Sequence, residues 1–158
     1  MVILDSVKDI VVKFTKNNVK LAIAESCTGG YISNAITNIS GASKVFERGI
    51  VCYSNNSKID LLNVDPGRID QFGAVSEIVA KQLAYNIRVL SNVNIGIGIT
   101  GIAGPTGGTA EKPVGLVFIG FSTEKDTIVE KHQFKAERIT FKEKVLEKVL
   151  SLLQNFSL

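Results

Sequence analysis

Short apolar segments alternate with amphipathic segments of helical periodicity over the first two-thirds of the chain. The clearest apolar segments have the length of strands and occupy residues 19–25, 48–54 and 93–100. The clearest helical patterns occupy residues 29–39 and 77–90. Strands that alternate with helices are typical of a sheet covered by helices on both faces. The pattern therefore predicts an α/β fold.

The last third of the chain departs from this alternation. Residues 114–122 and 127–134 are strand-like and flank the turn-forming sequence TEKD, so they are predicted to form a hairpin. Residues 138–156 are predicted to form a long amphipathic helix. The hairpin adds antiparallel pairing, which makes the predicted sheet mixed and mostly parallel. We predict a three-layer α/β/α fold in a single domain spanning residues 1–158, with active groups at the strand ends.

Local signals mark the boundaries of the middle elements. Asn55 is predicted to cap a short helix over residues 55–62, and Ser76 is predicted to cap the longer helix that follows it. The sequence VDPG at residues 64–67 predicts a turn between these two helices.

The composition is that of an ordinary globular protein. Of the 158 residues, 45% are hydrophobic and 21% are charged, and the net charge is +3. The basic residues form no continuous run and the chain has no Trp, which argues against a dedicated nucleic-acid-binding surface. No segment reaches the roughly 18 uninterrupted apolar residues of a membrane span, and the N-terminal sequence lacks the features of a secretory signal. We expect a cytoplasmic protein that binds neither nucleic acid nor membrane.

The two cysteines, Cys27 and Cys52, are too few for a disulfide scaffold and are expected to be free thiols. No cluster of His, Cys, Asp and Glu has metal-ligand spacing, so no structural zinc is predicted. A homo-oligomer is expected, and a dimer is favoured because twofold dimers are the most frequent closed assemblies.

The sequence AESCTGG at residues 24–30 is not explained by folding alone. It places Ser26, Cys27, Thr28 and two glycines where a predicted strand leads into a helix. The first N–H groups of a helix lack partners within the helix, and small residues let a ligand approach them. These amides could hold an anion, or the oxyanion of acyl transfer, with the Ser26 hydroxyl beside them. The alternative is that Ser26 or Thr28 only caps the helix.

The sequence CYSNNSK places Tyr53, Asn55 and Lys58 at the end of a strand and in the first turn of a helix. A serine nucleophile needs a base, and the only histidine, His132, lies in the predicted hairpin. A lysine whose charged form is destabilised by burial can serve as that base instead. The alternative is that Lys58 is an ordinary solvated helix residue.

Residues 101–113 are predicted to form a glycine-rich loop after a strand. The Thr100 hydroxyl directly precedes this loop, and the Thr106 hydroxyl lies within it. Long loops of this kind are unusual without a function, and this one suits close contact between backbone amides and a polar ligand. A G-x-G-x-x-G pattern spans residues 96–101. We discount it as a dinucleotide fingerprint because two of its glycines lie within the strand and no helix follows.

Four short sequences together carry a family resemblance: AESCTGG, YSNNSK (residues 53–58), GAVSE (residues 73–77) and TGIAGPTGGTAEKPVG (residues 100–115). They resemble the C-terminal domain of the competence/damage-inducible protein family (CinA), and more narrowly its stand-alone nicotinamide-nucleotide amidases. The likeness runs from about Leu21 to Arg138. Longer family members carry a preceding molybdopterin-binding-like domain, which this sequence does not show.

This resemblance implies hydrolysis of the carboxamide of nicotinamide mononucleotide, giving nicotinate mononucleotide and ammonia, without a metal or cofactor. It makes Ser26 the nucleophile, Lys58 the base and Tyr53 a group that holds or relays the proton. It also implies that the double glycine and the glycine-rich loop receive the nucleotide. The substrate-binding residues that follow from it are Cys27, Thr28, Gly29, Gly30, Asn55, Thr100, Gly101, Ala103, Gly104 and Arg138.

One segment departs from the family pattern. The family has Gly-Asp-Arg followed by a second arginine four residues on, whereas here Ala136 and Glu137 precede Arg138, and Lys142 stands at the second basic position. Lysine lacks the planar, bidentate geometry of arginine. The departure bears on nucleotide affinity and specificity, and not on the predicted catalytic residues.

Two alternatives stay open at the level of sequence. Cys27 could replace Ser26 as the nucleophile because a helix N-terminus lowers a thiol pKa. Against this, no histidine partner is evident, and successive strand residues point in opposite directions. The chain could also be a non-catalytic nucleotide-binding module linked to competence or the DNA-damage response, in which Lys58 would contact phosphate.

Overall fold

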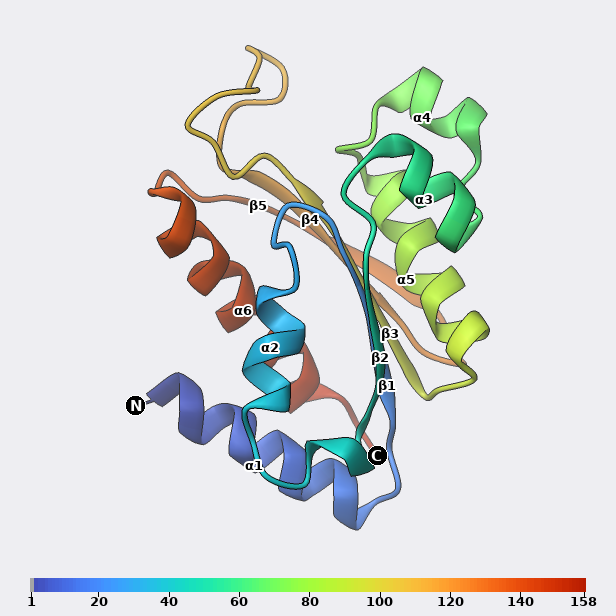
Figure 1. Cartoon of the computed structure of the whole chain (residues 1–158), viewed down its shortest axis with the longest axis vertical. Helices are drawn as coiled ribbons and strands as arrows, with labels where there is room; N and C mark the ends of the chain where they lie inside the picture. The colour runs from blue at the N-terminus through green and yellow to red at the C-terminus, as the bar shows by residue number, and fades with distance from the viewer. Residues whose placement is uncertain (1) are drawn as a thin grey trace.

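A computed structural model describes residues 2–158 and contains one five-stranded sheet with the order β2-β1-β3-β4-β5 (Figure 1). β1 pairs in parallel with β2 and with β3, whereas β4 is antiparallel to both β3 and β5. All strands except β4 therefore run in the same direction, which confirms the mixed sheet. The strands are β1 (Leu21–Glu25), β2 (Phe46–Val51), β3 (Ile95–Gly101), β4 (Leu116–Ser122) and β5 (Thr127–Gln133).

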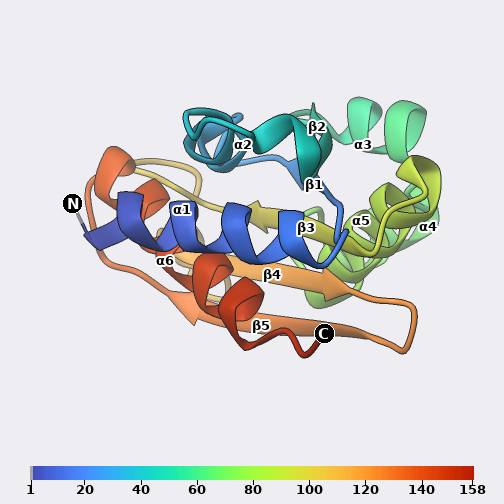
Figure 2. The same cartoon turned by 90° about the horizontal axis from the view of Figure 1, so that it is seen from below.

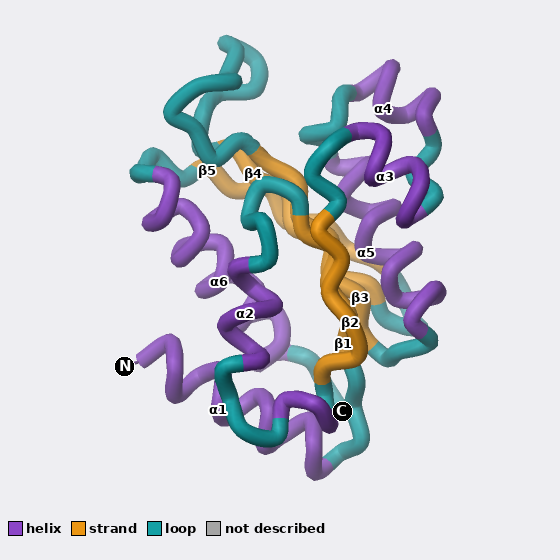
Figure 3. Tube along the Cα trace, viewed as in Figure 1, coloured by secondary structure: helices purple, strands orange, loops and turns teal. Residues whose placement is uncertain are grey.

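Helices cover both faces of the sheet, as the alternating pattern predicts (Figures 1 and 3). One layer contains α1 (Val2–Lys16), α2 (Tyr31–Thr37) and α6 (Arg138–Asn155), which share a single apolar core with the sheet. The view from below shows α1 and α6 side by side across this face (Figure 2). The other layer contains α3 (Asn55–Leu62), α4 (Pro66–Phe72) and α5 (Glu77–Ser91). The three-layer α/β/α architecture is thus confirmed.

One face of β3 carries isoleucines and the other carries glycines, and the glycines let α5 lie close to the strand. Its isoleucines at 95, 97 and 99 point into the core under α1, α2 and α6. Its glycines, Gly96 and Gly98, face α5 so closely that a Cβ atom on either would collide with the backbone of Ala84. Gly120 of β4 is similarly close to the Ala80 carbonyl. The first two glycines of the G-x-G-x-x-G pattern, Gly96 and Gly98, therefore serve helix packing, whereas Gly101 packs against the start of β4.

Element boundaries differ from the sequence predictions at two points. Residues predicted as a turn form α4, because Pro66 occupies the first helical position and the Asp65 carboxylate accepts the Gly67 N–H at 2.8 Å. The cap of α3 is Ser54 and not Asn55, since the Ser54 hydroxyl accepts the Ser57 N–H at 3.0 Å.

The helix predicted from residue 29 begins two residues later, at Tyr31. Gly29 and Gly30 have φ angles of 60° and 97°, which lie in the left-handed region and place both residues outside the helix. The double glycine thus forms a turn between β1 and α2. None of the helices described over residues 2–158 has the length and apolar character needed to cross a membrane.

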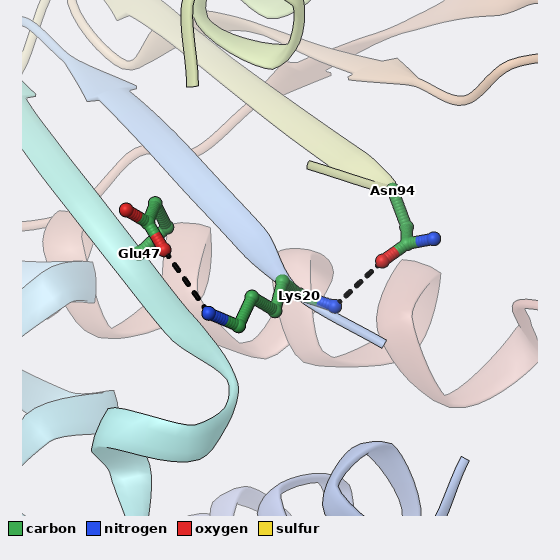
Figure 4. A network of polar contacts seen from close by, with 3 residues as sticks. All are labelled: Lys20, Glu47 and Asn94. Carbon is green, nitrogen blue, oxygen red and sulfur yellow. Dashed lines mark hydrogen bonds and ion pairs between the residues drawn. The ribbon is translucent and has the colours of Figure 1, made fainter. Parts of the chain in front are cut away.

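A small polar network ties together the strand starts at the end of the sheet where β1 begins (Figure 4). The Lys20 N–H donates to Asn94 Oδ1 at 2.8 Å, and Lys20 Nζ lies 3.3 Å from Glu47 Oε2. Both groups of this ion pair are substantially exposed, so the pair contributes little to stability. The candidate catalytic residues lie past the opposite ends of the parallel strands.

Close packing of α5 on β3 predicts that Gly98→Ala destabilises the protein. The new Cβ would lie 2.7 Å from the Ala80 carbonyl oxygen and from Leu83 Cβ, so α5 must shift. We expect the free energy of unfolding to fall by about 1–3 kcal/mol, measured by urea denaturation. Gly67→Ala is the matched control, because its Cβ would meet only the Asp65 side chain, at 3.2 Å. Equal unfolding midpoints for the two variants would contradict the packing argument.

Candidate active site

The candidate site is built from segments that leave the same edge of the parallel part of the sheet. Glu25, at the end of β1, is in register with Val51 of β2 and Ile99 of β3. In each of these three segments the next residue is Ser26, Cys52 and Thr100, respectively. Three segments distant in sequence are thereby brought together where open α/β sheets bind ligands.

Ser26 and Lys58 are in direct contact across this edge. Lys58 Nζ lies 2.9 Å from Ser26 Oγ, within reach for proton transfer. Both residues are buried, with exposed fractions of 7% for Ser26 and 1% for Lys58. The structure thus brings together the predicted nucleophile and base, and the alternative of a solvated Lys58 is wrong.

The surroundings of Lys58 Nζ are three uncharged oxygen atoms. Besides Ser26 Oγ, the nitrogen has two acceptors, the carbonyls of Cys52 at 2.8 Å and Tyr53 at 3.1 Å. The three N–H bonds of an ammonium suit these three oxygens; once deprotonated, the amine keeps two N–H bonds for the carbonyls and has a lone pair that can accept the Ser26 hydroxyl. Burial lowers the pKa of Lys58 from its ordinary value of 10.5, because desolvation disfavours the charged form. No carboxylate pairs with this amine among the described residues.

A pocket of about 250 Å³ opens beside this pair. Its lining includes the three predicted catalytic residues, Ser26, Lys58 and Tyr53. Of the predicted substrate-binding residues, it includes Cys27, Asn55, Thr100, Gly101, Ala103, Gly104 and Arg138. The glycine-rich loop therefore forms one wall of the pocket, and no strand or helix interrupts the loop between Gly101 and Leu116.

Sequence reasoning missed one wall of the pocket. Ala74 and Val75 belong to the lining, and the Ala74 carbonyl accepts a hydrogen bond from the Thr100 hydroxyl at 2.9 Å. Their only signal in the sequence is the family-like GAVSE segment, which carries no reactive side chain at these positions. The remaining lining residues are Ile102, Thr106 and Gly107.

Thr28, Gly29 and Gly30 do not line the pocket. Thr28 is fully buried, and its hydroxyl has no hydrogen-bond partner within residues 2–158. Gly29 lies against α6, where Lys142 Nζ is 3.8 Å from the position that a Cβ on Gly29 would take. The double glycine thus shapes the turn that carries Ser26 without touching this pocket.

The N-terminal amides of α2 are occupied by a side chain of the protein, contrary to the expectation that they hold an anion. Glu25 Oε1 accepts the N–H of Ile32 at 2.7 Å and of Ser33 at 3.1 Å. The turn itself retains other donors. The N–H groups of Cys27 and Thr28 take part in no backbone–backbone hydrogen bond in the described part of the chain.

Arg138, the first residue of α6, connects two walls of the pocket. Its Nη1 donates to the Gly104 carbonyl at 2.6 Å, and its Nη2 donates to the Tyr53 hydroxyl at 3.0 Å. Tyr53 therefore contributes its carbonyl to Lys58 and its hydroxyl to Arg138. Neither acceptor of Arg138 carries a charge, so the guanidinium is an uncompensated cation at the pocket.

Cys27 faces the pocket as a neutral thiol. Burial raises its pKa to about 12, so the thiolate that would act as a nucleophile is scarce near neutral pH. Cys52 is also a free, buried thiol, and its Sγ lies 3.4 Å from the Glu25 carbonyl oxygen. The only histidine, His132, lies on β5, contacts Glu130 Oε2 at 2.7 Å and takes no part in the pocket lining.

The chain belongs to the CinA C-terminal domain family: residues 4–157 match that family. A CinA-like protein of Koribacter versatilis is 51% identical over 118 residues, which make up 75% of this chain and 28% of that protein. A relative from Thermoanaerobacter sp. (strain X514) is 43% identical over 155 residues, or 98% of this chain and 38% of the relative. The chain thus spans less than two-fifths of these curated relatives.

Solved structures show the same fold. The competence/damage inducible protein CihA from Agrobacterium tumefaciens superposes with a TM-score of 0.93 at 36% identity, covering 96% of this chain and 93% of that one. A competence-damaged protein (CinA) superfamily protein from Escherichia coli gives a TM-score of 0.92 at 26% identity, covering 98% of this chain and 90% of that one.

The lowered pKa of Lys58 predicts a pH dependence of stability. At a pH between the folded-state pKa and 10.5, unfolding takes up a proton on Lys58, so the free energy of unfolding rises with pH in that window. Lys58→Met removes this contribution. We expect the stability difference between wild type and variant to change in favour of wild type as pH rises towards 10.5, measured by urea titrations. A difference that is independent of pH would show that Lys58 titrates as a solvated lysine.

Proposed function

We propose that this chain is an amidase that hydrolyses the carboxamide of nicotinamide mononucleotide to the carboxylate and ammonia. The observation that carries the proposal is the buried contact of 2.9 Å between Ser26 Oγ and Lys58 Nζ. A lysine with a lowered pKa beside a serine hydroxyl is the arrangement of Ser–Lys hydrolases. Membership of the CinA family and the resemblance of its motifs to nicotinamide-nucleotide amidases supply the substrate.

In the first half of the reaction, neutral Lys58 accepts the Ser26 proton as Ser26 Oγ attacks the carboxamide carbon. The carbonyl electrons move to the oxygen, which becomes the oxyanion of a tetrahedral intermediate. We assign its stabilisation to the Cys27 N–H, which directly follows the nucleophile and makes no backbone–backbone hydrogen bond among the described residues. Collapse of the intermediate breaks the C–N bond, and the leaving nitrogen takes the proton from the Lys58 ammonium to depart as ammonia.

In the second half of the reaction, water is the nucleophile and Ser26 Oγ is the leaving group. A water molecule gives a proton to neutral Lys58 and attacks the acyl ester on Ser26, and the new intermediate collapses to release the carboxylic acid. Ser26 Oγ regains its proton from Lys58, which restores the starting state. Every proton passes through Lys58 Nζ, so no histidine is needed.

Arg138 is the group best placed to bind the substrate's phosphate. Its guanidinium lines the pocket, and its acceptors among residues 2–158 are the Gly104 carbonyl and the Tyr53 hydroxyl, both neutral. A phosphate would replace a neutral acceptor with an anionic one and gain charge-assisted hydrogen bonds. Lys142 lies one helical turn further along α6 and adds a second positive charge. The contacts of Tyr53 favour a role in holding substrate over one in relaying the Ser26 proton.

Two properties expected from the sequence, a cytoplasmic location and assembly into a homo-oligomer, stay predictions.

Changing the nucleophile tests the reaction directly. We expect Ser26→Ala to reduce ammonia release from nicotinamide mononucleotide by at least about 1,000-fold, because no other activated nucleophile lies beside Lys58. Ser43→Ala is the matched control and should keep kcat close to wild type, since Ser43 is an exposed serine that does not line the pocket. Undiminished turnover by Ser26→Ala would overturn the assignment. Tight nucleotide binding by wild type without product would instead support the non-catalytic module.

The phosphate role of Arg138 predicts a change in substrate preference. Arg138→Ala should raise KM for the mononucleotide by about 10–100-fold through loss of a charge-assisted contact, and should affect the riboside, which lacks the phosphate, far less. Lys148→Ala is the control, because it removes a charge from an exposed position on the same helix. Equal losses with both substrates would place the role of Arg138 in pocket structure alone.

A further inference from the structure

We propose that Glu25 is the positioning residue for Ser26: its carboxylate anchors the start of α2 and so fixes the turn that carries the nucleophile. This inference rests on the proposed amidase function. Nothing in the reaction described above uses the Glu25 side chain, although it precedes Ser26 directly and is completely buried.

The first observation is the pair of hydrogen bonds that the carboxylate accepts. Glu25 Oε1 binds the N–H groups of Ile32 and Ser33, both in the first turn of α2. The N-cap residue of α2 is Gly30, which has no side chain to cap the helix. Glu25 therefore supplies the cap from the neighbouring strand, and a negative charge at a helix N-terminus is stabilising.

These hydrogen bonds close the nucleophile turn at its far end. At the near end, the Ser26 N–H donates to the Ile99 carbonyl at 3.1 Å, which ties the turn to β3. Between the two anchors lie Gly29 and Gly30, whose left-handed conformations leave the turn little intrinsic stiffness. Without the carboxylate anchor, the turn would be held only at its near end and by its own hydrogen bonds, from the Gly29 N–H to the Ser26 carbonyl and from the Tyr31 N–H to the Thr28 carbonyl, each at 3.1 Å.

Glu25 also fixes the other half of the catalytic pair. Its carbonyl oxygen accepts the Cys52 N–H at 2.8 Å. The Cys52 carbonyl in turn accepts from Lys58 Nζ at 2.8 Å. The main chain of Glu25 thus positions the acceptor of the base while its side chain positions the nucleophile, so one residue sets the Oγ–Nζ distance from both sides.

The N–H groups of Ile32 and Ser33 need a hydrogen-bond acceptor from the side chain of residue 25. Glu25 Oε2 is buried and has no hydrogen-bond partner among residues 2–158, and it lies close to Gly30. A glutamine could keep the accepting oxygen but would place an NH₂ group, with two donors, where no acceptor is found. Burial raises the pKa of Glu25, whereas the N–H groups of Ser33, Ile32 and Gly30, and then the Lys142 ammonium, act to lower it.

The test compares Glu25→Gln and Glu25→Ala with wild type in the ammonia-release assay on nicotinamide mononucleotide. Misplacement of a reacting group by about 1 Å can cost about 100-fold in rate. We expect kcat to fall by about 10–100-fold in Glu25→Gln and further in Glu25→Ala, with KM changed by less than about threefold because the pocket walls that bind the nucleotide are untouched. Partial rescue by the glutamine, which keeps one acceptor oxygen, is part of the expectation.

Thr37→Gly is the matched control for a weakened helix. Thr37 lies at the opposite end of α2, where its hydroxyl donates to the Ser33 carbonyl at 2.9 Å, and glycine removes this hydrogen bond and has a lower helix propensity. We expect this variant to lose stability but keep kcat. If it loses kcat as Glu25→Gln does, or if both Glu25 variants turn over within twofold of wild type, the positioning role is overturned. Should Glu25→Ala fail to fold, Glu25→Gln alone decides the matter.

Wild-type protein and Ser26→Ala are assayed alongside to separate the two proposals. An inactive wild type would overturn the amidase function, and with it this inference. An active wild type, an inactive Ser26→Ala and fully active Glu25 variants would overturn the inference alone.

Discussion

The site depends on one physical constraint, which is that an amine buried beside a hydroxyl must be satisfied without a counter-ion. A charged ammonium at the position of Lys58 would lose its hydration and gain no carboxylate in return. The neutral amine has its needs met by the carbonyls of Cys52 and Tyr53 and by the Ser26 hydroxyl. The same contacts that make burial of Lys58 tolerable therefore prepare it to accept a proton. Stability and reactivity follow from a single arrangement.

The scaffold meets this constraint because neighbouring parallel strands reach the same edge of the sheet. β1 and β2 end in register with Ile99 of β3, which continues to Gly101, so the residues after β1 and β2 and the last residues of β3 meet at one edge. The close approach of α5 to Gly96 and Gly98 holds β3 firmly, and β3 supplies the Thr100 and Gly101 wall of the pocket. Packing far from the chemistry thus determines where the pocket wall stands relative to Ser26.

Much of the fold could be predicted from the sequence, because the strongest signals are local. Ser76 followed by an amphipathic run specifies α5, and continuous apolar segments specify β1 and β4. The Asp65-Pro66-Gly67 sequence was predicted as a turn, although Asp and Pro also begin helices, and the structure forms α4 there. The alternating glycines of β3 reveal a strand but not the helix that requires them, because that contact joins segments distant in sequence.

The site was predictable in its residue types and less so in its geometry. The motifs identify Ser26 and Lys58, yet the short helix around Lys58 gives no sign that this lysine is buried, since burial depends on Cys52 and on the neighbouring turn. Ala74 and Val75 carry no reactive group, so no chemical argument selects them. Glu25 ends an apolar run and has the appearance of an ordinary strand terminus. Its role emerges only once α2 is seen to lack a cap of its own.

The capping arrangement also explains how a turn that reaches the pocket through Ser26 and Cys27 can be fixed. A helix N-terminus that binds substrate must remain open, and its amides are then ordered only when the ligand is present. Here α2 is capped permanently by Glu25, so its amides are satisfied before any substrate arrives. The donors left for the reaction are those of the turn itself, next to the nucleophile. Separating the group that orders the turn from the groups that meet the substrate allows Ser26 to be preorganised in the free protein, which is the condition for stabilising a transition state without a reorganisation cost.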